Sequence, residues 1–173
     1  PLYSPRRRLT EIVAKASGRS PSPTFKAVGA DNVSTGSMAG MRMLHYLRQK
    51  LGDQLAIWPF DDFKQRLDKV KLVLVEIFPS YYFYRVGMSP VKQAAAQAEF
   101  LTNALRFYDS DGVDPDFVAQ GADADEADAI ISAAALRYFS RQKTSQLQTM
   151  FDLSESIAVT ARKEGWIFGV QPR

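Results

Sequence analysis

Residues 121–139, reading GADADEADAIISAAALRYF, place several carboxylates at the start of a segment that is otherwise small and apolar. The pattern predicts a helix over residues 123–142. At about 100° per residue, the inward stripe of this helix consists of Asp128, Ile131, Ala135 and Phe139. Asp125 lies about 60° from Asp128 and Glu126 lies roughly opposite it. One carboxylate of this helix is therefore expected to point toward the core.

An inward carboxylate costs several kcal/mol unless something positive meets it, and a bound metal ion is one such partner. Capping is the alternative, because Asp123 and Glu126 form an Asp-x-x-Glu capping box and acids in a first turn suit the helix dipole. Capping explains Asp123, Glu126 and Asp125. It leaves Asp128 unexplained, so the helix start is a candidate metal site.

The composition favours a globular protein with a core of its own. The chain has 173 residues, of which 46% are hydrophobic, and no apolar run approaches the length of a membrane span. We therefore expect no membrane partner and a cytoplasmic location. The absence of cysteine and the single histidine, His45, exclude a disulfide framework, thiol catalysis and a His-rich metal site. A metal would have to be held by oxygen.

Charge is unevenly distributed along the chain. Residues 1–26 carry six Lys or Arg and one acid, whereas residues 109–128 carry eight Asp or Glu and no base. Such a separation suits a metal-dependent enzyme acting on phosphodiesters, because bases hold phosphate and acids hold cations. A solvated arm and an acidic loop are the simpler alternative.

In chain order, a basic, Pro- and Ser-rich segment (residues 1–30) precedes a single domain (residues 31–173). The segment has little core of its own and at most a short helix over residues 9–16. Apolar spacing predicts helices over residues 37–50, capped by Ser34 or Thr35, and over 91–108. Buried strands are predicted at residues 55–60 and 71–78, and residues 165–170 form a short apolar strand or a docking segment. The layout is an α/β fold with helices covering a mixed sheet.

Glu76 lies inside the clearest predicted strand, KLVLVEIF, and is a second acid without a structural reason. It either reaches solvent at the strand's carboxyl end or serves a function there, since ligands of α/β folds gather at that edge. The aromatic residues 81–84 that follow either stack on bases or pack locally.

These residues resemble the ribonuclease-H-like superfamily, in particular its Holliday-junction resolvase branch, in Glu76 at a strand end and in Asp125-Glu-Ala-Asp128-Ala on a helix. A closer likeness is to an uncharacterised family of predicted ribonuclease-H-like nucleases. The shared phrases are Gly40-Met41-Arg42, Trp58-Pro59-Phe60-Asp61, Val75-Glu76-Ile77-Phe78-Pro79 and Glu164-Gly165-Trp166-Ile167-Phe168-Gly169-Val170.

The resemblance implies a nuclease in which Glu76, Asp125 and Asp128 bind two Mg²⁺ or Mn²⁺ ions that drive phosphodiester hydrolysis. The candidate phosphate contacts are Arg6, Arg7, Arg8 and Arg42, with nucleic acid as the partner. The superfamily also carries an Asp on its first strand, and no matching strand precedes the first helix here, so we expect the N-terminal part of the fold to be absent. The alternative is a catalytically inactive domain that binds nucleic acid or protein.

Overall fold

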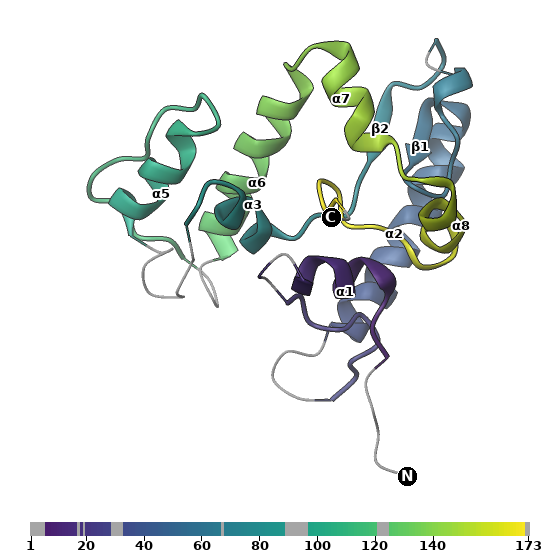
Figure 1. Cartoon of the computed structure of the whole chain (residues 1–173), viewed down its shortest axis with the longest axis horizontal. Helices are drawn as coiled ribbons and strands as arrows, with labels where there is room; N and C mark the ends of the chain where they lie inside the picture. The colour runs from purple at the N-terminus through teal and green to yellow at the C-terminus, as the bar shows by residue number, and fades with distance from the viewer. Residues whose placement is uncertain are drawn as a thin grey trace. The chain divides into compact units, whose positions relative to one another are not determined.

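The computed structural model describes residues 6–16, 18, 20–28, 33–66, 68–88, 97–120 and 125–171. The chain is a mixed α/β protein that divides into two compact units (Figure 1). Pro1–Glu76 and Phe151–Arg173 form the first unit, and Ile77–Met150 forms the second. The basic N-terminal segment is part of the first unit.

The first unit is built on two short parallel strands. β1 (Leu55–Ile57) pairs with β2 (Leu72–Leu74) in the register Leu55↔Leu72 to Ile57↔Leu74. Short 3-10 turns, η1 (Gly52–Gln54) and η2 (Lys64–Arg66), lie before and after β1. The strands predicted over 55–60 and 71–78 are therefore too long. The turn around the cis Trp58–Pro59 bond ends β1, and β2 keeps an exposed Leu72, so it is not covered on both faces as predicted.

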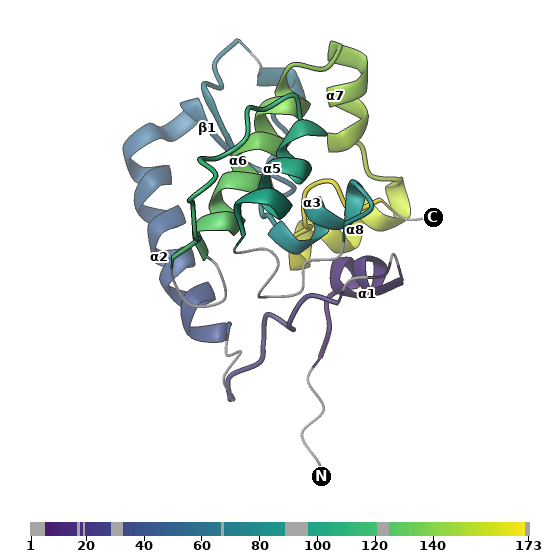
Figure 2. The ribbon, with the colours of Figure 1, turned by 90° about the vertical axis from the view of Figure 1, so that its left-hand side faces the viewer.

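Helices α1 (Leu9–Ala16), α2 (Ser34–Leu51) and α8 (Glu155–Glu164) complete this unit. Figure 2 shows α2 as a long helix beside β1. The helix predicted at 9–16 is confirmed, and its Thr10, Glu11 and Ala14 are buried within the first unit. The predicted cap of α2 is wrong. Its N-cap is Val33, and Ser34 already belongs to the helix.

Aromatic packing closes the core of the first unit. The ring of Trp58 meets the edges of Phe151 and Phe168 at centroid distances of 5.8 and 5.7 Å, and Phe63 packs on Phe151 at 5.2 Å. Burial of such rings supplies much of the folding free energy of a small core. The terminal segment predicted at 165–170 is fully buried, and Ile167 forms an isolated parallel bridge with Glu76.

The second unit is helical in its described residues. α3 (Pro79–Arg85) and α5 (Ala98–Arg106) both pack on α6 (Asp125–Ser140), and α7 (Thr144–Phe151) follows. The prediction of α6 is confirmed, and Ile131, Ala135 and Phe139 are buried on its inward stripe. Part of the helix predicted at 91–108 appears as α5, while residues 89–96 lie outside the described residues.

The aromatic residues 81–84 serve local packing, as the simpler of the two predictions held. Tyr82 and Phe83 are fully buried, and Tyr82 contacts Phe139 at 6.1 Å between ring centroids. The hydroxyl of Tyr108 donates a hydrogen bond of 2.7 Å to the carbonyl of Tyr82. Tyr81, Tyr82 and Phe83 are thus held inside the unit, whereas Tyr84 is partly exposed.

Candidate functional site around Glu76

Backbone contacts with residues 167–168 fix the position of Glu76. The residue follows β2 by two positions, at the carboxyl end of the strand. Its carbonyl accepts a hydrogen bond of 2.8 Å from the amide of Phe168, next to the bridge with Ile167. The Glu76 side chain remains 39% exposed. Glu76 therefore lies just beyond the end of β2, not inside the strand predicted over residues 71–78, and it is partly open to solvent.

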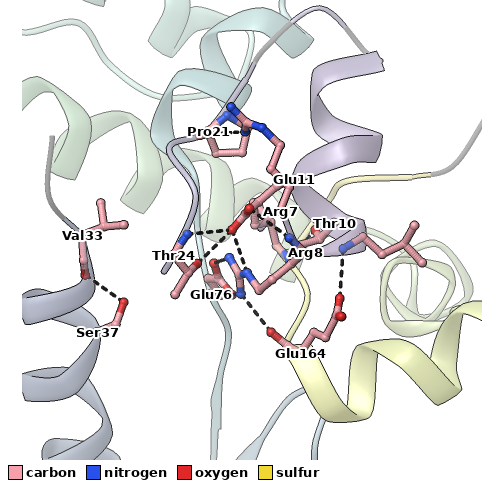
Figure 3. Close-up of polar contacts among 12 residues, drawn as sticks. Arg7, Arg8, Thr10, Glu11, Pro21, Thr24, Val33, Ser37, Glu76 and Glu164 are labelled. Carbon is pink, nitrogen blue, oxygen red and sulfur yellow. Dashed lines mark hydrogen bonds and ion pairs between the residues drawn. The ribbon is translucent and has the colours of Figure 1, made fainter. Parts of the chain in front are cut away.

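The positive partner of Glu76 is Arg8, from the start of α1 (Figure 3). Arg8 Nη2 lies 2.5 Å from Glu76 Oε1, and Nη1 lies 2.8 Å from Oε2, so the contact is bidentate. Paired N–H donors of this kind match the two oxygens of a carboxylate and give strong, directional hydrogen bonds. The positive charge that an acid at this strand requires is thus supplied within the chain.

Glu11 holds Arg8 from its other side. Arg8 Nε donates to Glu11 Oε1 at 2.8 Å, and the exposed fractions of the two side chains are 8% and 0%. The amide of Arg8 donates to Glu11 Oε2, and the amide and hydroxyl of Thr24 both donate to Oε1. A fully buried carboxylate is tolerated only when its charge and lone pairs are met in this way.

The third anchor of Arg8 is the end of α8. Nη1 also donates to the carbonyl of Glu164 at 3.1 Å, and the Glu164 carboxylate accepts the amide of Leu9 at 3.0 Å. Burial alone would lower the pKa of Arg8, but the hydrogen bond and charge of Glu76, followed by those of Glu11, outweigh it and raise the pKa. Arg8 is therefore a permanent cation that joins three distant parts of the chain.

Gly165 makes room for the ion pair. Its φ of 81° lies in the left-handed region that favours glycine. A Cβ at this position would lie 3.1 Å from Arg8 Nη1 and 3.4 Å from Glu76 Oε2. The backbone turn after α8 thus approaches the ion pair closely only because the residue has no side chain.

A cavity of about 320 Å³ opens beside the pair, within the size range of small-molecule sites. Its wall is mainly apolar, with Arg8 and Glu76 as its charged part. The phrases that carried the family resemblance all contribute to this wall, through Gly40 and Met41, Trp58 and Phe60, Val75 and Glu76, and Gly165 and Trp166. Segments far apart in the sequence therefore meet at one place, around the Glu76 carboxylate.

The four arginines predicted to contact phosphate have different environments. Arg6 is exposed, and Arg7 donates a hydrogen bond of 2.7 Å to the carbonyl of Pro21. Arg8 is buried and bound to two carboxylates, which corrects the expectation that all three residues form one phosphate-binding patch. Arg42 is exposed on α2.

The predicted aspartates lie in the second unit, at the start of α6. Asp125 is exposed, and Asp128 is half-buried one turn further on. The carbonyl of Asp128 accepts a hydrogen bond from the Ser132 hydroxyl at 2.6 Å. The Glu126 carboxylate accepts a hydrogen bond of 2.9 Å from the amide of Gln120, in the segment before the helix, whereas Asp123, the other half of the predicted capping box, lies outside the described residues.

Glu76, Asp125 and Asp128 all offer carboxylate oxygens, which hard divalent cations prefer, but Glu76 belongs to the first unit and the two aspartates belong to the second. One further feature opposes a cation at Glu76. Both oxygens of Glu76 already accept hydrogen bonds from Arg8, so a cation would have to share or replace that partner. Across the described ranges, no group of three or more His, Asp or Glu side chains is placed to hold a metal ion.

Sequence reasoning missed Glu11, Thr24 and Glu164 as parts of this network. The one local signal was the i, i+3 spacing of Arg8 and Glu11 at the start of a helix, which allows the two side chains to meet. The contacts with Thr24, Glu76 and Glu164 join residues far apart in the sequence and have no local signature.

The fold and site define a mixed α/β protein whose buried arginine joins two carboxylates at the edge of a cavity. Comparisons with protein families, curated proteins and solved structures find no match for this chain. None of the helices in the described part of the chain is both long and apolar enough to cross a membrane.

Proposed function

We propose that this chain is a divalent-metal-dependent nuclease of the ribonuclease-H-like type, with Glu76, Asp125 and Asp128 as its metal-ligating carboxylates. The observation that supports this most is the convergence of the four resemblance phrases on the cavity beside Glu76. The four phrases come from segments far apart in the sequence, and all of them contribute to the wall beside one carboxylate. Ligand sites of α/β proteins also gather at the carboxyl ends of strands, where Glu76 lies.

In this proposal the ions, Mg²⁺ or Mn²⁺, supply an activated water and stabilise the leaving oxygen of the phosphodiester. The chain's own part is to hold the carboxylates. The bridge with Ile167 and the bond from the Phe168 amide fix the Glu76 backbone, while Arg8 orients its side chain. The rigid helix α6 carries Asp125 and Asp128 on successive turns.

A Mn²⁺ titration tests the proposal. A ligand that binds only the folded protein, present at about 100 times its dissociation constant, raises the free energy of unfolding by about 2.7 kcal/mol. We expect such a rise in wild type, measured by thermal unfolding with and without Mn²⁺. It should be absent in the Asp125→Asn, Asp128→Asn variant and reduced in Glu76→Gln.

The matched control is Asp111→Asn, Asp116→Asn, which removes the same charge from exposed positions of the second unit. It should keep the full response to Mn²⁺. Cleavage of a fluorophore-labelled oligonucleotide, followed in the same buffers, should depend on Mn²⁺ and disappear with the Asp125→Asn, Asp128→Asn change. A wild-type protein that shows neither a Mn²⁺-linked shift nor cleavage would refute the nuclease proposal.

The bidentate contact of Arg8 with Glu76 favours a second candidate, a catalytically inactive domain of the same type that binds nucleic acid. Here Arg8 occupies the place of the cation, and the pair serves stability alone. This candidate predicts oligonucleotide binding that falls steeply with salt and needs no metal. The two candidates separate in EDTA, where the inactive domain keeps all of its function and the nuclease loses its cleavage.

A further inference from the structure

Helix α2 is the longest helix of the first unit and the least buried. None of its 18 residues is buried, although it includes several large apolar side chains. Exposed Met38, Met41, Met43 and Tyr46 lie along it, and Tyr46 is 53% exposed. Exposed apolar groups concentrated on one helix are a common mark of a binding surface.

The charge of α2 has a single sign. Residues 34–51 include Arg42, Arg48 and Lys50 and not one Asp or Glu. Arg48 forms an ion pair of 2.8 Å with Asp61. Within the described ranges no acid pairs with Arg42 or Lys50, and both are exposed. Two cations of this helix are thus available to an anionic partner.

Spacing joins the two features into one surface. Met38, Arg42, Tyr46 and Lys50 follow one another at intervals of four residues, which places them in a row along one side of the helix. We call these four residues the α2 row. Arg42 and Lys50 are about 12 Å apart along the axis, with the aromatic ring between them. The Lys50 ammonium lies 5.7 Å from the centre of the Tyr46 ring.

We infer that the α2 row binds single-stranded nucleic acid, with Arg42 and Lys50 contacting phosphates and Tyr46 stacking on a base. Cations alternating with an exposed aromatic ring are how proteins hold single strands, since the cations follow the backbone and the ring meets a base face. A duplex keeps its bases stacked inside and would leave Tyr46 without a partner. The flexible Met38 side chain adapts to an irregular base face.

This inference deepens the proposed function, because it names single-stranded nucleic acid as the substrate class. It rests on the proposed function only in taking nucleic acid as the partner. The surface belongs to the same unit as the cavity, and Gly40 and Met41 of α2 line that cavity. Binding through the row needs no metal. It can therefore be measured in EDTA, where cleavage does not occur.

The experiment measures the anisotropy of a fluorescein-labelled oligothymidylate titrated with the full chain in EDTA at several salt concentrations. For single strands the slope of log K against log salt changes by about 0.7 per phosphate contact, so Arg42→Ala, Lys50→Ala should reduce it by about 1.4. Tyr46→Ala should weaken binding about fivefold or more, and Tyr46→Phe should restore it.

The charge-matched control is Arg141→Ala, Lys143→Ala, which alters exposed residues of the second unit and should leave the slope unchanged. Circular dichroism checks that each variant is folded, as expected for changes at exposed positions. A duplex of the same length should bind more weakly than the single strand and should be insensitive to Tyr46→Ala.

Four outcomes would overturn the inference. They are no binding of the oligothymidylate, an equal salt slope in the Arg42→Ala, Lys50→Ala variant and wild type, equal affinity for duplex and single strand, and binding only to anionic phosphatidylserine vesicles. The last result would assign the row to a lipid surface. The Asp125→Asn, Asp128→Asn variant should bind the oligothymidylate as wild type does. A failure of the nuclease proposal can therefore be told apart from a failure of this inference.

Discussion

Replacing Arg8 by methionine should destabilise the first unit more than any exposed substitution. The change keeps an unbranched, space-filling chain but removes the cation that Glu11 and Glu76 share. Taking one partner from a buried ion pair costs about 3–5 kcal/mol, because the other charge is left buried. Glu11 keeps hydrogen bonds from the Arg8 amide and from Thr24, so we expect the lower end, about 3 kcal/mol.

The contribution of Glu76 should be smaller. Its side chain is 39% exposed, so water screens the pair, and exposed ion pairs contribute about 0–1 kcal/mol. Glu76→Gln should therefore lower the free energy of unfolding by about 1 kcal/mol or less. Comparing the two single variants separates the buried half of the network from its open half.

Urea unfolding followed by tryptophan fluorescence is the assay for these variants. Both tryptophans of the chain, Trp58 and Trp166, are buried in the first unit, so their emission reports this unit. In the Arg8→Met, Glu11→Gln variant the orphaned charge is gone while an amide oxygen can still accept from Thr24, so much of the lost stability should return. A loss below about 1 kcal/mol in Arg8→Met, or a double variant no more stable than the single one, would refute the reasoning.

Three further perturbations follow from the structure. Gly165→Ala should lower the free energy of unfolding by about 1–3 kcal/mol, because the residue has a positive φ and its Cβ would contact Arg8. Gly36→Ala in α2 has open space at the Cβ and should raise the free energy of unfolding by about 0.5–1 kcal/mol. Urea unfolding measures both changes. Burial raises the pKa of Tyr108 to about 12. The tyrosine of the unfolded state ionises first, near pH 10, so the second unit should lose roughly 2–3 kcal/mol of folding stability as pH rises from 10 to 12. Tyrosinate absorbance and unfolding measurements should show this loss, and Tyr108→Phe should reduce it.

Helices with clear apolar spacing were predictable from the sequence. The stripe of Ile131, Ala135 and Phe139 identified α6, because side chains three or four positions apart share a face. Residues 147–164 are polar and show little periodicity, yet they form the rest of α7 and all of α8. The described part of α8 buries only Ala161, so tertiary contacts and not an apolar stripe specify it.

Strand lengths were not predictable from local pattern. The run KLVLVEIF reads as one buried strand, but only Leu72–Leu74 pairs with β1. A strand lasts as long as its partner supplies hydrogen bonds, and β1 ends at the turn around Trp58 and Pro59. Beyond that point a different partner, Ile167, bridges Glu76, and nothing local in either segment identifies the other.

The sequence indicated Glu76 as a candidate site residue but did not indicate Arg8 as its partner. The sequence indicated that an acid such as Glu76 at a strand end needs a reason, and it led to a metal ion as the positive partner. The structure supplies Arg8, which was assigned to a phosphate-binding patch because it stands in a run of arginines. Whether a basic residue meets solvent or a buried carboxylate depends on contacts between distant segments.

Glu11 is fully buried and Glu76 is partly exposed, and this difference bears on the nuclease proposal. Glu11 and the Glu164 carbonyl would still hold Arg8 if the Glu76 side chain turned away, so the guanidinium would keep buried partners. A cation binding Glu76 would thus replace the contact between Arg8 and Glu76 while Arg8 kept its other partners. Leaving a buried charge without a partner is the costly step in breaking a buried ion pair, and that step is avoided here. Mn²⁺ should therefore be tolerated at Glu76 in wild type. In a Glu11→Gln variant Arg8 depends more on Glu76 for its negative partner, so the Mn²⁺-linked rise in stability should shrink. Glu11 is fully buried, so this effect would act through Arg8.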